Sequence, residues 1–164
     1  MQQAQIDALQ QEWLVAHAVG RCLHIGCGMK PVAGAVNVDP DPHKRAWADV
    51  AALGTRLPFV DGVFDSVVSS HVLNLFPDIA IALQEMARVL KAGGTMAHVV
   101  PDWRYTPNHL TSRYVYQRQY SGWHGPQEFE KAVGTLTGLA LTATDFTEFK
   151  WAFKVEATKC TPIS

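Results

Sequence analysis

Two glycines and an aspartate are placed where they could bind a nucleoside. Gly26 and Gly28 flank Cys27 directly after a short apolar run, and Asp39 follows a second apolar run 11 residues beyond Gly28. A turn made of glycines lets a ligand approach the backbone closely, because no side chains stand in the way. A carboxylate after the next strand can accept hydrogen bonds from both hydroxyls of a ribose. The combination predicts a nucleoside site, although a G-x-G turn alone can also be purely structural.

The same turn argues against a dinucleotide site. Turns that bind dinucleotides carry the pattern G-x-G-x-x-G, whose third glycine allows close packing of helix on strand. In this chain Pro31 stands where the third glycine would lie. A phosphate cradle is therefore not expected, and neither is a nicotinamide oxidoreductase.

Several side chains could transfer a proton or act as a nucleophile. His71 and Asp102 each follow an apolar run, and His124 lies in an irregular stretch. A base is useful where the reacting group of a substrate is a hydroxyl or a protonated amine. The structural alternatives are that His71 caps a strand and that Asp102 accepts from turn amides. His98 is expected to be a core histidine, and Cys27 a small turn residue for which no base partner can be named.

The chain around these residues predicts a regular alternation of strands and helices. Apolar residues at helical spacing predict helices over 3–19, 77–90 and 126–137. Short apolar runs predict strands over 22–25, 35–38, 44–50, 64–69, 95–100, 139–146 and 151–158. The last run alternates apolar and polar residues, which is typical of a half-exposed antiparallel strand. We therefore expect an α/β fold with a mostly parallel sheet covered on both faces.

Length, charge and cysteine content exclude several classes of protein. The 164 residues suit a single domain over 1–164, with an N-terminal helix within 1–20. A net charge of −1 argues against a general nucleic-acid binder. No apolar run reaches the roughly 18 residues of a membrane span, and no signal peptide is evident. The three cysteines are odd in number and have no metal-ligand spacing, so neither a metal site nor a disulfide framework is expected, and a reducing cytoplasm is the expected location.

Four segments carry a resemblance to a known family. They read LHIGCG at 23–28, VNVD at 36–39, LPFVDGVFDSVVSSHVL at 57–73 and LQEMARVLKAGGTMAHVVP at 83–101. In order and spacing they resemble the class I S-adenosylmethionine-dependent methyltransferases. Among these they are most similar to the methyltransferase type 11-like proteins, in a compact branch with a short connection from the glycine turn to the second strand. The resemblance implies a Rossmann-like, doubly wound, seven-stranded sheet that is mostly parallel, with an antiparallel last strand. Only six residues separate Gly28 from Ala35, so the first crossover helix is expected to be shortened or absent.

The resemblance also implies a cofactor, S-adenosyl-L-methionine, and the residues that would bind it. These are Gly26, Cys27, Gly28, Asp39, Asp49, Ser70 and His71. The backbone of the glycine turn would contact the methionine part, and Asp39 would bind the ribose hydroxyls. Asp49 is a displaced candidate for the adenine amine. Residues 70–71 would line the sulfonium and its methyl group.

Three positions depart from the family pattern. His24 stands where many members carry an acid, Leu53 lies near the usual place of an adenine-binding acid, and Asn74 replaces a frequent glutamate. These departures leave open an alternative function. In that alternative the chain is a non-catalytic partner or regulatory protein that keeps the methyltransferase fold and binds the cofactor weakly or not at all.

The irregular segment 101–125 follows the fifth predicted strand, where members of the family commonly insert a lid over the acceptor. It is rich in aromatic and basic side chains: Trp103, Arg104, Tyr105, Arg113, Tyr114, Tyr116, Arg118, Tyr120 and Trp123. Stacking and bidentate contacts from such residues suit a flat or anionic small molecule. The same residues could instead form a cover helix or a subunit interface.

The resemblance therefore predicts an enzyme that transfers a methyl group to the oxygen or nitrogen of a small-molecule acceptor. His71 and Asp102 are the predicted catalytic residues. Nucleic-acid amino methyltransferases carry an [N/D/S]-P-P-[Y/F] tetrad where this chain reads SSHV at 69–72, which argues against nucleic-acid bases as acceptors. Aminopropyl transfer would want an acidic pocket, whereas segment 101–125 is basic.

Overall fold

The computed structural model describes residues 3–102, 125–133, 138–145 and 152–161, whose strands form one mixed sheet. The strands are β1 (Cys22–Ile25), β2 (Val36–Val38), β3 (Phe64–Ser70), β4 (Leu90–Pro101), β5 (Leu139–Asp145) and β6 (Ala152–Lys159). Their order is β2-β1-β3-β4-β6-β5. The first four are parallel, and β6 runs antiparallel to both β4 and β5. The predicted mostly parallel sheet with an antiparallel last strand is confirmed.

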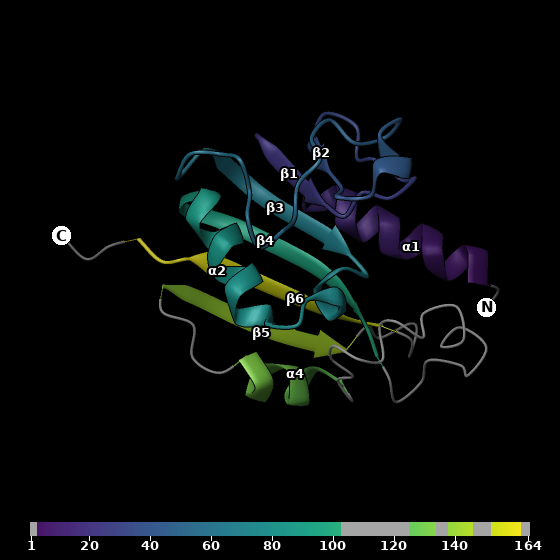
Figure 1. The fold of residues 1–164 in the computed structure, drawn as a ribbon. Helices are drawn as coiled ribbons and strands as arrows, with labels where there is room; N and C mark the ends of the chain where they lie inside the picture. The colour runs from purple at the N-terminus through teal and green to yellow at the C-terminus, as the bar shows by residue number, and fades with distance from the viewer. Residues whose placement is uncertain (1–2, 103–124, 134–137, 146–151, 162–164) are drawn as a thin grey trace.

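Helices cover both faces of this sheet. They are α1 (Gln3–Ala16), α2 (Ile79–Val89) and α4 (Pro126–Val133), with short 3-10 helices η1 (Pro42–Lys44) and η2 (Leu73–Leu75). Ile6 and Leu14 of α1 pack with Val68 and Val99 in one apolar cluster. Residues of α2 and α4 pack in a second cluster with alternate residues of the same strands, such as Val67. Figure 1 shows α2 crossing in front of the sheet, and the clusters place α1 on the opposite face.

The short connection from β1 to β2 contains no helix, as the sequence predicts. A side chain of β2 holds this connection in place. Asn37 Oδ1 accepts from Val32 N at 2.9 Å, and Asn37 Nδ2 donates to Val32 O and Ala35 O, each at 3.1 Å. The His24 ring on β1 adds a bond from Nδ1 to Asn37 Oδ1 at 3.0 Å. Asn37 thus satisfies backbone groups that a crossover helix would otherwise satisfy internally.

The strand predicted over 44–50 is wrong in its extent. The segment begins with η1, because Asp41 accepts from His43 N at 2.9 Å and Pro42 favours a helical first turn. Within the segment, Val50 alone forms a β-bridge, an isolated parallel one to Val38. Within the described residues the sheet therefore has six strands plus this bridge, and a seventh strand stays a prediction.

Other boundaries shift for local reasons. Helix α2 begins at Ile79, because the Asp78 carboxylate accepts from Ala80 N at 2.9 Å and from Ile81 N at 3.3 Å. Strand β4 starts at Leu90 rather than 95, with an irregular register opposite the start of β3. Phe146, the predicted end of the strand over 139–146, and Trp151, the predicted start of the strand over 151–158, lie outside the described residues. No helix in the described part of the chain is long and apolar enough to cross a membrane.

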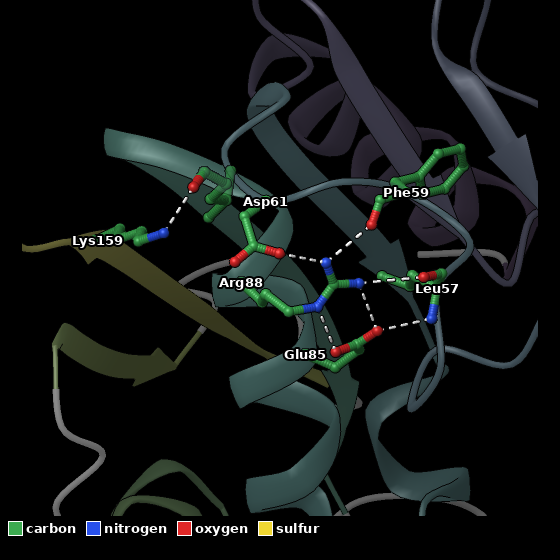
Figure 2. A network of polar contacts seen from close by, with 7 residues as sticks. Leu57, Phe59, Asp61, Glu85, Arg88 and Lys159 are labelled. Atoms are coloured by element: carbon green, nitrogen blue, oxygen red, sulfur yellow. Dashed lines mark hydrogen bonds and ion pairs between the residues drawn. The ribbon is translucent and has the colours of Figure 1, made fainter.

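An arginine clamps the loop that leads into β3. Figure 2 shows the Arg88 guanidinium donating to Glu85, to Asp61 and to the carbonyls of Leu57 and Phe59, at 2.7–3.1 Å. Glu85 in turn accepts from Leu57 N at 2.8 Å. The hydrogen bonds from Arg88 hold the pKa of Glu85 below its ordinary value. The network fixes the amino-terminal end of β3, at the edge opposite to the carboxyl ends of the parallel strands.

The outer strand β5 receives a contact from a helix. Glu130 on α4 accepts a hydrogen bond from Ala143 N at 2.6 Å. On its other side β5 pairs with β6 along its whole length. A helix side chain therefore occupies one of the backbone donors of the strand.

Candidate functional site

The carboxyl ends of the four parallel strands bring most of the predicted site residues to one edge of the sheet. Gly26 follows β1, Asp39 follows β2, His71 follows β3 and Asp102 follows β4. The backbone joins these ends, since Gly26 N donates to Val38 O at 2.7 Å and His71 N donates to Val99 O at 2.8 Å. Ligands of open parallel sheets bind at this kind of edge.

The two glycines of the turn serve different purposes. Both have positive φ angles, +66° at Gly26 and +54° at Gly28, which side chains rarely adopt. A Cβ at Gly26 would overlap with Val72 Cγ2, so packing alone requires glycine there. A Cβ at Gly28 would meet no atom of the described residues within 4 Å. As far as these residues go, the space over Gly28 is open, as a turn that accepts a ligand against its backbone requires.

The Asp39 carboxylate organises this turn. Its Oδ2 accepts from Gly28 N and its Oδ1 from Asp41 N, both at 2.9 Å. Only 9% of Asp39 is exposed. A carboxylate has about four lone-pair sites, so each oxygen can accept a further hydrogen bond. Asp39 thus holds the turn in shape and keeps lone pairs free for further donors, while its role toward ribose hydroxyls stays a prediction.

Cys27 points into the protein between these residues. Its sulfur lies 3.8 Å from Gly28 O and 3.7 Å from Trp47 O, and the residue is buried. Burial, followed by the charges of Asp39 and Asp49, raises the pKa of the Cys27 thiol to about 11. The thiol is therefore protonated near neutral pH, which agrees with a turn residue and not with a nucleophile.

Asp49 lies at the outer side of β2. Its Oδ2 accepts from Asn37 N at 2.8 Å and lies 3.4 Å from Asn37 Nδ2. This contact ties the segment after η1 to the sheet. Leu53, near the usual place of an adenine-binding acid, is 56% exposed. A role for Asp49 toward an adenine amine stays a prediction.

His71 has an unusual backbone conformation at the end of β3. Its φ is +57°, in the left-handed region that non-glycine residues rarely adopt. Its Nε2 lies 2.9 Å from Gln10 Oε1 on α1. The residue reaches solvent, but the protein around the ring desolvates it and lowers the pKa of His71 to about 4; Asp7 opposes this shift and Lys30 adds to it. Solvent moderates the desolvation without changing its direction, so the imidazole is neutral near pH 7.

Two further polar side chains are buried near the same ends of the sheet. His98 on β4 is fully buried, and its Nδ1 lies 2.8 Å from Ser69 Oγ. Among the described residues its Nε2 has no hydrogen-bond partner. Burial lowers the pKa of His98 to about 3, which agrees with the predicted core histidine. Asp102 is 1% exposed. Its carboxylate lies directly after β4, where the sequence predicts it.

The remaining predicted site features divide into two groups. Ser70 is half-buried at the last position of β3. His124 and residues 103–124 of the predicted lid lie outside the described residues. In the described part of the chain no three His, Cys, Asp or Glu side chains are grouped as metal ligands would be.

Sequence reasoning missed Gln10. Its helix was predicted from apolar spacing, which gives no reason to assign a role to one of several glutamines. Ser69 was missed as well, because a serine inside an apolar run carries no signal of its partner on the neighbouring strand.

Comparisons of sequence match part of the chain to known methyltransferases. Residues 23–98 match the family described as "Methyltransferase domain". Demethylmenaquinone methyltransferase of Mycobacterium marinum is 48% identical over 54 residues, which are 33% of this chain and 23% of that protein. The mitochondrial 2-methoxy-6-polyprenyl-1,4-benzoquinol methylase of Leishmania donovani is 47% identical over 57 residues, 35% of this chain and 19% of that protein. The chain thus spans less than a quarter of the length of these curated relatives.

Comparisons of structure extend over nearly the whole chain. An S-adenosylmethionine-dependent methyltransferase of Thermotoga maritima has a TM-score of 0.70 at 17% identity, covering 96% of this chain and 90% of that one. Geranyl diphosphate C-methyltransferase of Streptomyces coelicolor, crystallised with S-adenosyl-L-homocysteine, has a TM-score of 0.68 at 14% identity, covering 96% and 78%. Because the sequence identities are low, this structural similarity establishes the fold alone.

Proposed function

From the class I S-adenosylmethionine-dependent methyltransferase fold of this chain, we propose that it transfers a methyl group from S-adenosylmethionine to the oxygen or nitrogen of a small-molecule acceptor. The match of residues 23–98 to the methyltransferase-domain family supports the class of reaction. The observation that carries the proposal is the hydrogen bond between the glycine turn after β1 and the Asp39 carboxylate after β2. Asp39 holds the amide of Gly28 at 2.9 Å, beside open space over that glycine.

The cofactor would lie across the carboxyl ends of β1, β2 and β3. The backbone of the glycine turn would face its methionine part, and Asp39 would accept the ribose hydroxyls. Ser70 and His71, at the end of β3, would lie beside the sulfonium, and Asp49 would be the candidate for the adenine amine. When bound, the cofactor would supply an electrophilic methyl group, so the protein would mainly have to align the acceptor with it.

His71 is the proposed base for an acceptor that must lose a proton. Its imidazole is neutral near pH 7, because desolvation by the surrounding protein lowers the pKa of His71. A neutral imidazole can accept a proton as the methyl group is transferred. Asp102 is the second candidate, since it is placed directly after β4 at the same edge.

The proposed acceptor is supported by resemblance and by the composition of segment 103–124. Two relatives are named for demethylmenaquinone and for 2-methoxy-6-polyprenyl-1,4-benzoquinol. Ajmaline N-methyltransferase of Rauvolfia serpentina is 30% identical over 98 residues, 51% of this chain and 34% of that protein. The aromatic and basic residues of 103–124 suit an aromatic or anionic acceptor. These names include both N- and C-methyltransferases, so the acceptor atom is part of the proposal.

Calorimetric titration with S-adenosylmethionine, and separately with S-adenosylhomocysteine, tests the proposal. We expect both to bind the wild-type chain. Asp39→Ala should weaken binding by roughly 1.5–3 kcal/mol, about 10- to 150-fold, because a charged hydrogen-bonding group is lost. Asp39→Asn keeps an acceptor for one backbone amide and separates loss of charge from collapse of the turn.

Asp61→Asn provides the matched control, because the Asp61 carboxylate pairs with Arg88 in the clamp at the opposite edge of the sheet. Its affinity for S-adenosylhomocysteine should equal that of the wild type. A folded wild-type chain that binds neither compound would overturn the proposal in favour of a non-catalytic protein with this fold.

A further inference from the structure

We propose that Gln10 on α1 is a positioning residue that fixes the protonated ring nitrogen of His71 and leaves the lone pair on Nδ1. The inference rests on the proposed function, in which His71 accepts a proton from the acceptor. It assigns the N-terminal helix a part in the chemistry at the sheet edge, although Gln10 and His71 are 61 residues apart in the sequence.

The position of Gln10 in its helix is the first observation. Ile6, Gln10 and Leu14 are spaced four residues apart and form one stripe of α1. Their exposed fractions are 3%, 5% and 0%, so this stripe is the face that packs on the sheet. A leucine would be enough for packing there. Burial removes the hydration of a side-chain amide, so a buried amide normally has a hydrogen-bond partner in the protein. The partner of Gln10 Oε1 is the His71 ring.

The chemistry of the contact then selects one tautomer. The amide oxygen of a glutamine only accepts hydrogen bonds, so His71 Nε2 must carry the hydrogen at 2.9 Å. A neutral imidazole has a single N–H, which leaves the lone pair on Nδ1. His71 is neutral near pH 7, so this choice of tautomer applies under ordinary conditions.

The orientation of His71 is fixed from two sides. Its backbone amide donates to Val99 O at 2.8 Å, which holds the residue at a φ of +57°. Its ring is held by Gln10 on the neighbouring helix. Asp7, one turn before Gln10, lies 3.9 Å from the Lys30 ammonium on the loop after β1. The charges of Asp7 and Lys30 act on His71 in opposite directions, so neither of them alone decides its protonation.

With a hydroxyl acceptor, His71 Nδ1 would take the hydroxyl proton while the acceptor oxygen formed its bond to the methyl carbon. S-adenosylmethionine would supply that methyl group, and its sulfur would keep the electron pair of the broken carbon–sulfur bond and become neutral. The imidazolium then returns its proton to water, with Nε2–H kept in place by Gln10.

Nitrogen NMR of the His71 ring tests the inference directly, with His71→Asn used to assign its signals. In the wild type we expect a single tautomer with hydrogen on Nε2. Gln10→Leu keeps the apolar stripe but should produce a mixture of tautomers and a changed His71 pKa. Gln10→Glu keeps an acceptor at this position, so it should restore the Nε2–H tautomer and raise the His71 pKa by about one unit or more.

Titration with S-adenosylhomocysteine on the same samples separates the two proposals. We expect Gln10→Leu to bind it within about twofold of the wild type, because Gln10 acts on the ring and not on the glycine turn. If the wild type binds but Gln10→Leu leaves both the tautomer and the pKa of His71 unchanged, the inference is overturned and the proposed function stands. If the wild type does not bind at all, the proposed function is wrong, and a positioning role for Gln10 in catalysis is overturned with it.

Discussion

The side-chain amide of Asn37 pairs with both backbone polar groups of Val32, accepting from its N–H at 2.9 Å and donating to its carbonyl at 3.1 Å. This arrangement resembles one step of a β ladder, made by a side chain. It allows the chain to pass from the glycine turn to β2 without a helix. The same Asn37 Oδ1 accepts from the buried His24 ring, so the turn, the connection and both strands are coupled.

Asn37→Ala should therefore destabilise the protein markedly. The substitution leaves buried polar groups of Val32 and His24 without their partner, which costs about 1–3 kcal/mol for each unsatisfied group. Urea denaturation followed by circular dichroism measures the loss. Gln11→Ala, which removes an amide at a partly exposed position of α1, should change stability by less than about 0.5 kcal/mol. Equal effects of the two variants would show that Asn37 does not hold the connection.

Alanine at the two glycines should have different effects. Each substitution places a side chain at a positive φ, which costs roughly 1–2 kcal/mol. Gly26→Ala also clashes with Val72, so it should lose more stability and recover part of it in the double variant Gly26→Ala/Val72→Ala. Gly28→Ala has free space around it, so it should remain folded yet bind S-adenosylhomocysteine at least tenfold more weakly. Unchanged affinity in Gly28→Ala would place the ligand elsewhere.

Stability should fall as the pH drops below about 6.5. Burial lowers the pKa of His98 to about 3 and also lowers the pKa of His24. Between the ordinary histidine pKa of about 6.5 and the lowered pKa of the folded state, the unfolded chain therefore binds more protons than the folded one. The stabilisation is fully present above the ordinary histidine pKa and is lost toward the folded pKa. One such histidine contributes a slope of up to about 1.4 kcal/mol per pH unit.

The double variant Ser69→Ala/His98→Leu tests the contribution of His98. It replaces both hydrogen-bonded partners with apolar side chains, so it leaves no new unpaired polar group. Chemical denaturation between pH 4 and 8 should give a shallower pH dependence than in the wild type. A slope equal to that of the wild type would assign the pH dependence to other groups.

Arg88→Lys should destabilise the protein without affecting cofactor binding. A lysine cannot reproduce the planar fork that reaches Glu85, Asp61 and two carbonyls at once. We expect a loss of about 1–3 kcal/mol in urea denaturation, as for other charged hydrogen bonds. The affinity for S-adenosylhomocysteine should stay within about twofold of the wild type, because the clamp lies at the edge of the sheet opposite to the glycine turn.

The fold could be predicted well from the sequence wherever apolar periodicity was strong. The runs leading to β1 and β3 were located to within one residue, and the antiparallel β6 followed from its alternation. The strand predicted over 44–50 was wrong because capping by Asp41 and the following turns outweighed a weak apolar pattern. Local hydrogen bonds of this kind compete with strand pairing and are not visible in hydrophobicity.

The site could be predicted only in part for a related reason. Residues directly after strands, such as Gly28 and Asp39, are placed by topology alone. Gln10 and Ser69 act through partners that are distant in sequence, His71 and His98. Contacts between elements depend on how those elements pack in three dimensions, and a single sequence contains no pattern for such a pair.

The hydrogen bond from Ala143 to Glu130 has a consequence for how this protein meets other copies of itself. Strand β5 lies at the end of the sheet order, so its outer backbone groups could pair with a strand of another molecule. The Glu130 carboxylate occupies one of these donors and places a negative charge beside it. An approaching strand would have to displace a charged group that is already bonded, so this contact protects the sheet against edge-to-edge aggregation.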